Sequence, residues 1–230
     1  MTESTSTPFP IIAILGGTGK EGPGLALRWA RAGYRIIIGS RRLEKAQATA
    51  SELNARLGTT HTIGMENNQA AQSADICVLT VEHSAHQAIL ENLKDSLKGK
   101  VLVDATARVD FLQPRPPSPP SAARLAQEIL GPEVRVVAAF QNIPAHILKS
   151  NLDQALNADV LICADDTQAA EEVMRIAEAG KMRAYYAGGL DNAVVVEGLT
   201  ALLISINKYY GVRTASIGIT GISRQAVYPQ

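Results

Sequence analysis

Three glycines near the N-terminus have the spacing of a loop that binds phosphate groups. Gly17, Gly19 and Gly22 follow the apolar stretch "IIAIL" and precede a run with apolar residues at helical spacing. Glycines let the backbone turn sharply and approach a pyrophosphate closely, while the free amides and positive dipole end of the helix face the phosphates. In the order strand, loop, helix, the GxGxxG pattern is typical of a dinucleotide site.

The residues between these glycines are expected to contribute backbone amides to the same loop; they are Thr18, Lys20 and Glu21. A second interpretation is a glycine-rich turn that only lets the helix pack closely on the sheet. The phosphate loop of nucleoside triphosphatases does not fit, because Ile14 and Glu21 occupy the places of its first glycine and its Ser or Thr.

The end of the second expected strand is basic, whereas an NAD site carries an acid there. Ser40 and Arg41 follow Gly39 at this place, and a 2′-phosphate with roughly two negative charges would bind them through charge-assisted hydrogen bonds. Lys45 lies four residues after Arg41 on the next helix and can point to the same side. The pattern predicts NADP(H) over NAD(H). Arg42 is either a further ligand of this phosphate or a solvated surface cation.

A catalytic acid or base does not emerge from the sequence. None of the six tyrosines has a lysine four residues later, so the Tyr-x-x-x-Lys pair of short-chain dehydrogenases is absent. His83 and His86 follow an expected strand and would lie beside a nicotinamide, but a structural or solvated role explains them equally well. Hydride exchange between two redox cofactors needs no protein acid, because each ring system carries its own electron sink. We assign no catalytic residue and no metal ligand.

Short β-branched runs alternate with helical ones in the first part of the chain, which predicts a Rossmann-type α/β fold with a doubly wound, mainly parallel sheet. Its ligand crevice lies at the carboxyl ends of the strands. We expect an NADP-binding domain over residues 1–140 and a smaller C-terminal α/β segment over 141–230. The expected strands are Ile11–Leu15, Arg35–Ile38, His61–Ile63, Ile76–Val81, Val101–Asp104 and Val134–Ala139.

Two later segments have distinctive compositions. The stretch Gln113–Ala122 holds five prolines and predicts a stiff surface connection that ends at a serine able to cap the next helix. The run Leu190–Tyr210 is apolar on most faces and predicts a buried helix, packed against the sheet or against another subunit.

Composition limits the classes of partner. With 22 basic and 22 acidic residues among 230, the chain has no basic stripe for nucleic acid. Cys77 and Cys163 lie in apolar strand-like runs, where we expect them to pack in the core. Since nothing suggests a disulfide, we expect the protein in the reducing cytoplasm. We also expect no membrane-spanning segment.

Five blocks occur in a fixed order along almost the whole chain: "IIAILGGTGKEGPGLALRWARAGYRIIIGSRRLEKA", "GMENNQAAQSADICVLTV", "FQNIPAHIL", "VLICADD" and "GGLDNAVVVEGLTALLISINKYYG". They resemble successive segments of the coenzyme F420-dependent NADP reductases. Those enzymes move hydride between NADP(H) and a 5-deazaflavin, and this activity is what the resemblance implies. The homodimer that we expect rests on the apolar run Leu190–Tyr210, which burial within one chain would explain equally well.

The resemblance also implies site residues. By the resemblance, the NADP contacts are expected at Thr18, Gly19, Lys20, Glu21, Ser40, Arg41 and Lys45. The glycine spacing and the basic strand end add Gly17, Gly22 and Arg42 to the expected cofactor-binding residues. The nicotinamide side is expected at His83, Ala107 and Ala145, with Val81 beside them. The deazaflavin side is expected at Asn142, Ile143, Pro144 and Ala145, together with the helix that begins near Leu190.

Departures from the family pattern lie near the hydride acceptor. Val81, Glu82 and His83 stand where some members have Ile-Pro-Trp, and Gln141 stands where some have histidine. Two alternative functions therefore stay open. One is an NADP-dependent reductase of a small imine, carbonyl or flavin, and the other is a redox sensor that binds NADP(H) without turnover.

Overall fold

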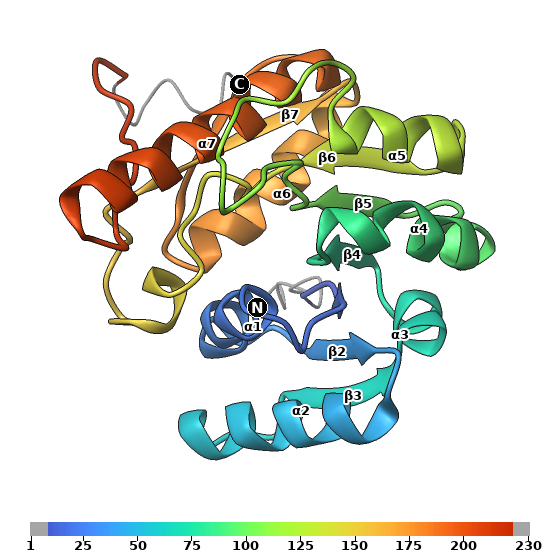
Figure 1. Cartoon of the computed structure of the whole chain (residues 1–230). Coiled ribbons are helices and arrows are strands. Elements are labelled where there is room, and N and C mark those ends of the chain that lie inside the picture. The colour runs from blue at the N-terminus through green and yellow to red at the C-terminus, as the bar shows by residue number, and fades with distance from the viewer. Residues whose placement is uncertain (1–8, 223–230) are drawn as a thin grey trace, which may run out of the picture.

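The computed structural model describes residues 9–222. Its centre is an eight-stranded sheet with the strand order β3-β2-β1-β4-β5-β6-β7-β8 (Figure 1). The strands are β1 (Ile12–Leu15), β2 (Ile36–Ser40), β3 (Thr62–Glu66), β4 (Ile76–Leu79), β5 (Val101–Asp104), β6 (Arg135–Ala138), β7 (Asp159–Ala164) and β8 (Arg183–Tyr186).

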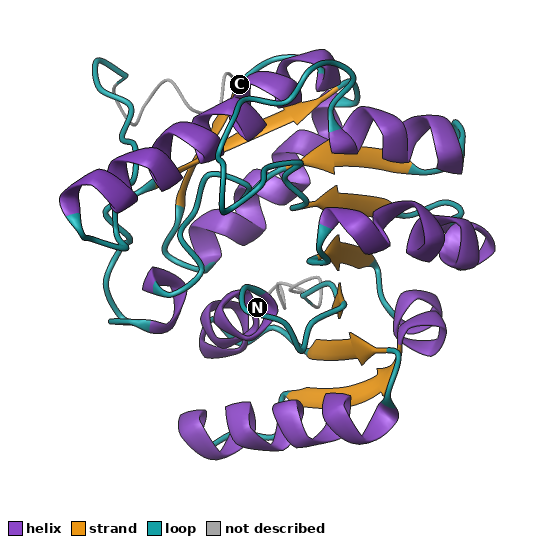
Figure 2. Cartoon of the chain, viewed as in Figure 1, coloured by secondary structure: helices purple, strands orange, loops and turns teal. Residues whose placement is uncertain are grey.

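Helices lie on both faces of this sheet, as Figure 2 shows. They are α1 (Gly22–Arg31), α2 (Leu43–Leu57), α3 (Asn67–Ser73), α4 (His83–Leu97), α5 (Ala122–Leu130), α6 (Thr167–Ala179) and α7 (Ala193–Tyr210), with the 3₁₀ turns η1 (Ile147–Lys149) and η2 (Leu190–Asn192).

The strands from β3 to β6 in this order are parallel, and so are β7 and β8, whereas β6 and β7 pair antiparallel. The doubly wound, mainly parallel α/β fold is therefore confirmed, and all six expected strands are present. The C-terminal residues add β7 and β8 to the same sheet. The boundary at residue 140 stays a prediction.

The sheet buries a separate hydrophobic layer on each face, because neighbouring residues of a strand point to opposite sides. Ile12 and Ile14 of β1 lie in the layer beneath α1, α2 and α6. Ala13 and Leu15 lie in the layer beneath α3, α4 and α5. Strands that are buried on both faces read as continuous apolar runs, which is how they appear in the sequence.

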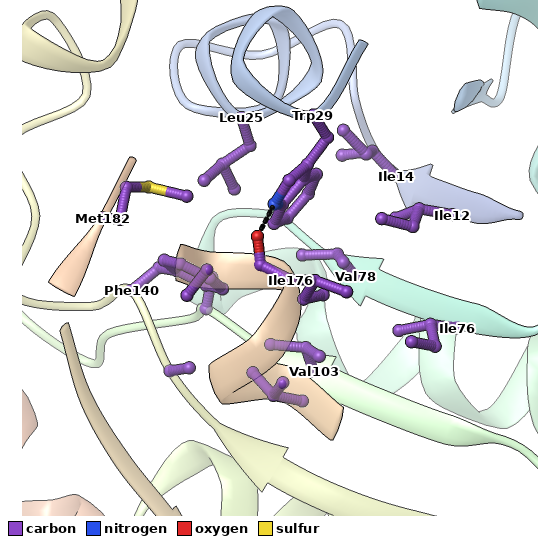
Figure 3. Close-up of a cluster of buried hydrophobic side chains, with 14 of the residues drawn as sticks. Ile12, Ile14, Leu25, Trp29, Ile76, Val78, Val103, Phe140, Ile176 and Met182 are labelled. Carbon is purple, nitrogen blue, oxygen red and sulfur yellow. Dashed lines mark hydrogen bonds between the residues drawn. The ribbon is translucent and has the colours of Figure 1, made fainter. Parts of the chain in front are cut away.

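Trp29 of α1 anchors the first of these layers (Figure 3). Its indole Nε1 donates a 2.8 Å hydrogen bond to the carbonyl oxygen of Ile176 in α6, and its ring meets Phe140 edge to face. A buried indole needs such a partner for its N–H group. The contact holds α1, which follows the glycine loop, against α6.

The late apolar run is only partly buried. It forms η2 and α7, and α7 leaves Val195, Leu202 and Tyr209 exposed. An 18-residue window of Leu190–Tyr210 has a mean hydropathy of 1.4 and is 39% buried, so by length and composition the segment is apolar enough to cross a bilayer. Core helices of proteins outside membranes share this length and composition, so the expectation of no membrane-spanning segment stays a prediction.

The proline-rich stretch connects β5 to α5 without regular secondary structure between residues 105 and 121. Ser121 caps α5, as expected, because its hydroxyl oxygen accepts a 3.0 Å hydrogen bond from the backbone N–H of Arg124. Glu197 of α7 holds the connection from the other side, where its carboxyl accepts hydrogen bonds from the backbone N–H groups of Arg108 and Ala122.

Candidate dinucleotide and hydride-transfer site

The glycine loop is packed too closely to admit side chains at most of its positions. A Cβ on Gly22 would lie 2.6 Å from the Cα of Gly17, and one on Gly16, whose φ is +71°, would lie 2.5 Å from Cγ1 of Val81. The backbone N–H of Gly17 donates a 2.9 Å hydrogen bond to the carbonyl oxygen of Gly39. The loop therefore lies against the ends of both β2 and β4.

Gly19 differs from its neighbours because nothing inside the protein requires it to be glycine. It is exposed, and a Cβ there would come no closer than 3.6 Å to a protein atom, which is ordinary contact. The space in front of Gly19 is on the solvent side, at the N-terminal end of α1. A bare backbone at this place fits the close approach of a pyrophosphate.

Glu21 brings a carboxyl group into the loop. Although the residue as a whole is only partly buried, its Oε1 is enclosed and has no hydrogen-bond partner among the described residues. Burial raises the pKa of Glu21 to about 8, from an ordinary value of 4.5. The carboxyl is therefore neutral at pH 7 and does not repel an anion. The sequence pattern did not indicate an enclosed carboxyl group, because only the backbone amide of Glu21 was expected to contribute to the loop.

The basic end of β2 presents cations that bind nothing else. Ser40 is buried and its hydroxyl accepts a 3.2 Å hydrogen bond from the backbone N–H of Arg42. Arg41, Arg42 and Lys45 are exposed, and within residues 9–222 none of their side chains forms a hydrogen bond or ion pair. Within the described residues these cations are thus available to an anionic ligand.

Asn67, the first residue of α3, supports the glycine loop, and it was not among the site residues predicted from the sequence. Its side-chain Oδ1 accepts a 3.1 Å hydrogen bond from the backbone N–H of Gly16, and a Cβ on Gly39 would lie 2.8 Å from the same oxygen. The signal that points to it is its position directly after β3, at the edge where ligands bind in parallel sheets.

Residues expected on the nicotinamide side gather where β4 and β5 end. Val81 lies against Gly16, Ala107 is partly buried, and His83 is the exposed first residue of α4. Partial desolvation lowers the pKa of His83, and the nearby His86 and Arg108 lower it further. The His83 side chain is exposed where α4 begins.

His86 has a structural position. It is buried, and its Nε2 lies 2.6 Å from Oδ2 of Asp104 at the end of β5. The two imidazole rings of His83 and His86 are 6.3 Å apart between centroids. The structural interpretation of His86 therefore holds.

In the segment expected on the deazaflavin side, residues 142–145, only some side chains are accessible to a ligand. Asn142 is buried, and its Nδ2 donates a 2.7 Å hydrogen bond to the carbonyl oxygen of Asp159 in β7. Ile143 is buried in the core beneath α1. Pro144 and Ala145 keep accessible side chains. Asn142 and Ile143 can therefore contact a ligand only through their backbone.

Gln141 carries an unused acceptor beside this segment. Its Nε2 donates a 2.8 Å hydrogen bond to the carbonyl oxygen of Asp104, while its buried Oε1 has no partner among the described residues. A buried acceptor of this kind costs free energy unless a donor reaches it.

The described residues contain no group of three or more His, Cys, Asp or Glu side chains suited to a metal ion.

Comparison with known proteins decides the family. The model of a family described as "NADP oxidoreductase coenzyme F420-dependent" matches residues 11–108. The F420-dependent NADP reductase of Methanothermobacter thermautotrophicus is 38% identical over 226 residues, which cover 93% of this chain and 96% of the relative. The chain belongs to the coenzyme F420-dependent NADP oxidoreductase family.

Other members of the family agree over similar lengths. The F420-dependent NADP reductase of Methanocaldococcus jannaschii is 38% identical over 227 residues, covering 92% of this chain and 98% of the relative. The crystal structure of a putative F420-dependent NADP reductase from Arthrobacter has a TM-score of 0.75 at 25% identity and covers 91% of this chain and 99% of that one. The chain thus spans these family members over nearly their full length.

Proposed function

We propose that this protein transfers hydride directly between C4 of the nicotinamide in NADP(H) and C5 of the deazaflavin ring in coenzyme F420. It is an NADP-dependent oxidoreductase by family, with NADP(H) and F420 as its two redox partners. One observation carries the assignment of NADP(H): the uncommitted cations at the end of β2 lie beside a glycine loop that is open at Gly19.

The proposed NADP site lies in the part of the chain before residue 140. The amides of the loop and of the first turn of α1 would bind the pyrophosphate, and the side chains at the end of β2 would bind the 2′-phosphate. Val81, His83 and Ala107 would border the nicotinamide. The proposed contacts to the dinucleotide's phosphates are Gly17, Thr18, Gly19, Lys20, Glu21, Gly22, Ser40, Arg41, Arg42 and Lys45.

The proposed deazaflavin site lies in the segment after residue 140. Pro144 and Ala145 would pack against the ring, and the backbone of Asn142 and Ile143 would complete that wall. A Cβ on Gly24 of α1 would lie 2.6 Å from Cβ of Leu148 and 3.4 Å from the carbonyl oxygen of Ala145. This close packing places the helix that follows the glycine loop directly against the proposed acceptor site.

The two ring systems supply the electron chemistry, because each acts as its own hydride donor or electron sink. The protein has to bind them, orient their reacting carbons and exclude water. Gln141 Oε1 suits an N–H donor such as the nicotinamide carboxamide, since it is a buried acceptor without a donor among the described residues. No protein acid or base is required for the hydride step.

We propose further that the protein acts as a cytoplasmic homodimer. Exposed apolar side chains of α7, including Leu202, Ile206 and Tyr209, form a surface that a second copy would cover. Cys77 and Cys163 are free and buried, and burial raises the pKa of Cys77 to about 12. Such thiols are inert structural residues and suit a reducing compartment.

The test of the function is NADPH oxidation by the purified protein with oxidised F420, followed by absorbance. We expect sustained turnover that requires F420. Turnover with an imine, carbonyl or flavin acceptor but not with F420 would identify another NADP-dependent reductase. Binding of NADPH without turnover on any acceptor would identify a sensor.

A further inference from the structure

Asp104 is a fully buried carboxyl residue at the end of β5, between the two halves of the proposed cleft. Its Oδ2 lies 2.6 Å from Nε2 of His86 in α4, and its Oδ1 accepts a 2.9 Å hydrogen bond from the backbone N–H of Thr106. Its carbonyl oxygen accepts the 2.8 Å hydrogen bond from Nε2 of Gln141. One residue thus connects α4, the connection after β5 and the segment after β6.

Two of these partners extend the connections further. The hydroxyl of Thr106 makes a longer contact of 3.5 Å with the carbonyl oxygen of Val81, where β4 ends. The carbonyl oxygen of Gln141 accepts a 2.8 Å hydrogen bond from the hydroxyl of Thr200 in α7. The network therefore reaches both the segments proposed to border the nicotinamide and those proposed to border the deazaflavin.

If packing alone determined the residue at position 104, an apolar side chain would be expected there, not a carboxyl group. The other residues of β5 are Val101, Leu102 and Val103, which are apolar and buried. Burying a carboxyl is costly unless its oxygens are hydrogen-bonded, and both oxygens of Asp104 are. Satisfied polar networks in a low-dielectric interior are rigid and specify a single arrangement.

Hydride transfer depends on such rigidity, because reacting atoms must approach within about 3–3.5 Å and a misplacement of about 1 Å costs roughly a hundredfold in rate. We propose that Asp104, with His86 as its partner, is a positioning residue for hydride transfer. It holds the nicotinamide-side and acceptor-side segments at a fixed separation and touches neither ring. This inference rests on the proposed function and adds a residue that contacts no ligand.

The test compares Asp104→Asn with Asp75→Asn in the full-length protein. An asparagine has one acceptor oxygen and one amide nitrogen in place of two carboxylate oxygens, so Asp104→Asn cannot accept hydrogen bonds from both His86 and Thr106. Asp75 precedes β4 at the opposite edge of the sheet, where its Oδ2 accepts a 2.7 Å hydrogen bond from the backbone N–H of Ile11. It is a control for the same carboxyl-to-amide change at an exposed position, since it also supports a strand end through its carboxyl.

We expect Asp104→Asn to lower kcat for NADPH-dependent F420 reduction about 10- to 100-fold. The KM for NADPH should change by less than about threefold, because the adenosine end of the site is untouched. Asp75→Asn should alter neither constant by more than about threefold. A wild-type kcat in Asp104→Asn, or an equal loss of kcat in Asp75→Asn, would overturn the inference.

His86 provides a second pair of variants if Asp104→Asn fails to fold. His86→Gln keeps an N–H donor for Asp104, whereas His86→Leu removes it. We expect kcat to decrease in the order wild type, His86→Gln, His86→Leu. Equal kcat values in the leucine variant and the wild type would contradict the positioning role.

A measurement without coenzymes tests the same network. Amide hydrogen exchange at Thr106 in the ligand-free protein should be at least about tenfold faster in Asp104→Ala than in wild type, because alanine removes the oxygen that accepts the hydrogen bond of the Thr106 N–H. Unchanged exchange at Thr106 would contradict the inference. Failure of the proposed function looks different, since the wild-type protein itself would then not reduce F420.

Discussion

Nε of Arg28 donates a 3.0 Å hydrogen bond to the carbonyl oxygen of Leu148, and this contact joins α1 to the segment that follows Ala145. The same guanidinium donates to the carbonyl oxygens of Ser150 and Gly180 at 2.9 and 3.2 Å. Arg28 is only 2% exposed and has backbone carbonyls rather than a carboxylate around it. Burial lowers the pKa of the Arg28 guanidinium. The helix of the proposed NADP site is thereby fixed to the proposed acceptor segment.

Arg28→Met should lower the free energy of unfolding by about 3 kcal/mol or more, because each buried carbonyl left without a donor costs about 1–3 kcal/mol. Urea unfolding measures this change. Arg31→Met on the same helix is the control, since Arg31 is 51% exposed and pairs with the exposed Asp153. Its loss should stay below about 1 kcal/mol. An equal decrease in the free energy of unfolding in the two variants would show that the hydrogen bonds from Arg28 to backbone carbonyls add no stability beyond that of an exposed ion pair.

The sequence predicted those parts of the fold that depend on local pattern. Apolar runs of β-branched residues marked the six strands, and the rule that ligands bind at strand ends placed Ser40 and His83 on the correct edge. The direction of β7 was not predictable, because residue periodicity carries no information on whether a neighbouring strand is parallel or antiparallel. The same limit applies to the joining of β7 and β8 to the main sheet.

The direction of individual side chains depends on contacts that are distant in sequence. Asn142 was expected to face the deazaflavin, yet it hydrogen-bonds to β7, 17 residues later. His86 finds Asp104 18 residues away, and Gln141 reaches Asp104 across 37 residues. Glu21 appeared to be a loop residue, and only the packed structure shows its carboxyl oxygen enclosed. The sequence pattern thus predicted a candidate site, but not the long-range contacts that fix the side chains around it.

Arg41→Ala should weaken NADP⁺ binding by about 1.5–3 kcal/mol, the value of a lost hydrogen bond to a charged group. The affinity for NAD⁺ should stay unchanged, since NAD⁺ has no 2′-phosphate. Calorimetric titration of both coenzymes measures the difference. Arg35→Ala is the control, because Arg35 is an exposed arginine that precedes β2 at the opposite edge of the sheet. An equal loss of affinity for both coenzymes in Arg41→Ala would remove the phosphate site at the end of β2.

Glu21→Gln should change how stability depends on pH. The pKa of Glu21 is about 8 in the folded protein and ordinarily 4.5, so between these values the folded state retains a proton that the unfolded chain releases. Wild-type stability contributed by this group therefore falls as pH rises through that window, by at most about 1.4 kcal/mol per pH unit. Glutamine does not ionise, so the free energy of unfolding of Glu21→Gln, measured relative to that of the wild type, should rise from pH 5 to pH 8.

Urea unfolding at several pH values checks the effect of Glu21→Gln, with Glu44→Gln in the exposed first turn of α2 as control. A difference between wild type and Glu21→Gln that does not vary with pH would contradict the raised pKa. NADP⁺ affinity gives a second measure. In the wild type it should decline above pH 8, where Glu21 ionises beside the pyrophosphate, and Glu21→Gln should remove that decline.

Gly19→Ala and Gly22→Ala should separate the two reasons for glycine in the loop. A methyl group on Gly22 would lie 2.6 Å from backbone atoms of Gly17, so this variant should lose about 1–3 kcal/mol of stability through overpacking. A methyl group on Gly19 meets no protein atom within 3.6 Å, so Gly19→Ala should keep its thermal midpoint. It should still lose at least about tenfold in NADP⁺ affinity, because the methyl group occupies the space that the phosphates need. Wild-type affinity in Gly19→Ala would mean that the pyrophosphate does not lie against this part of the loop.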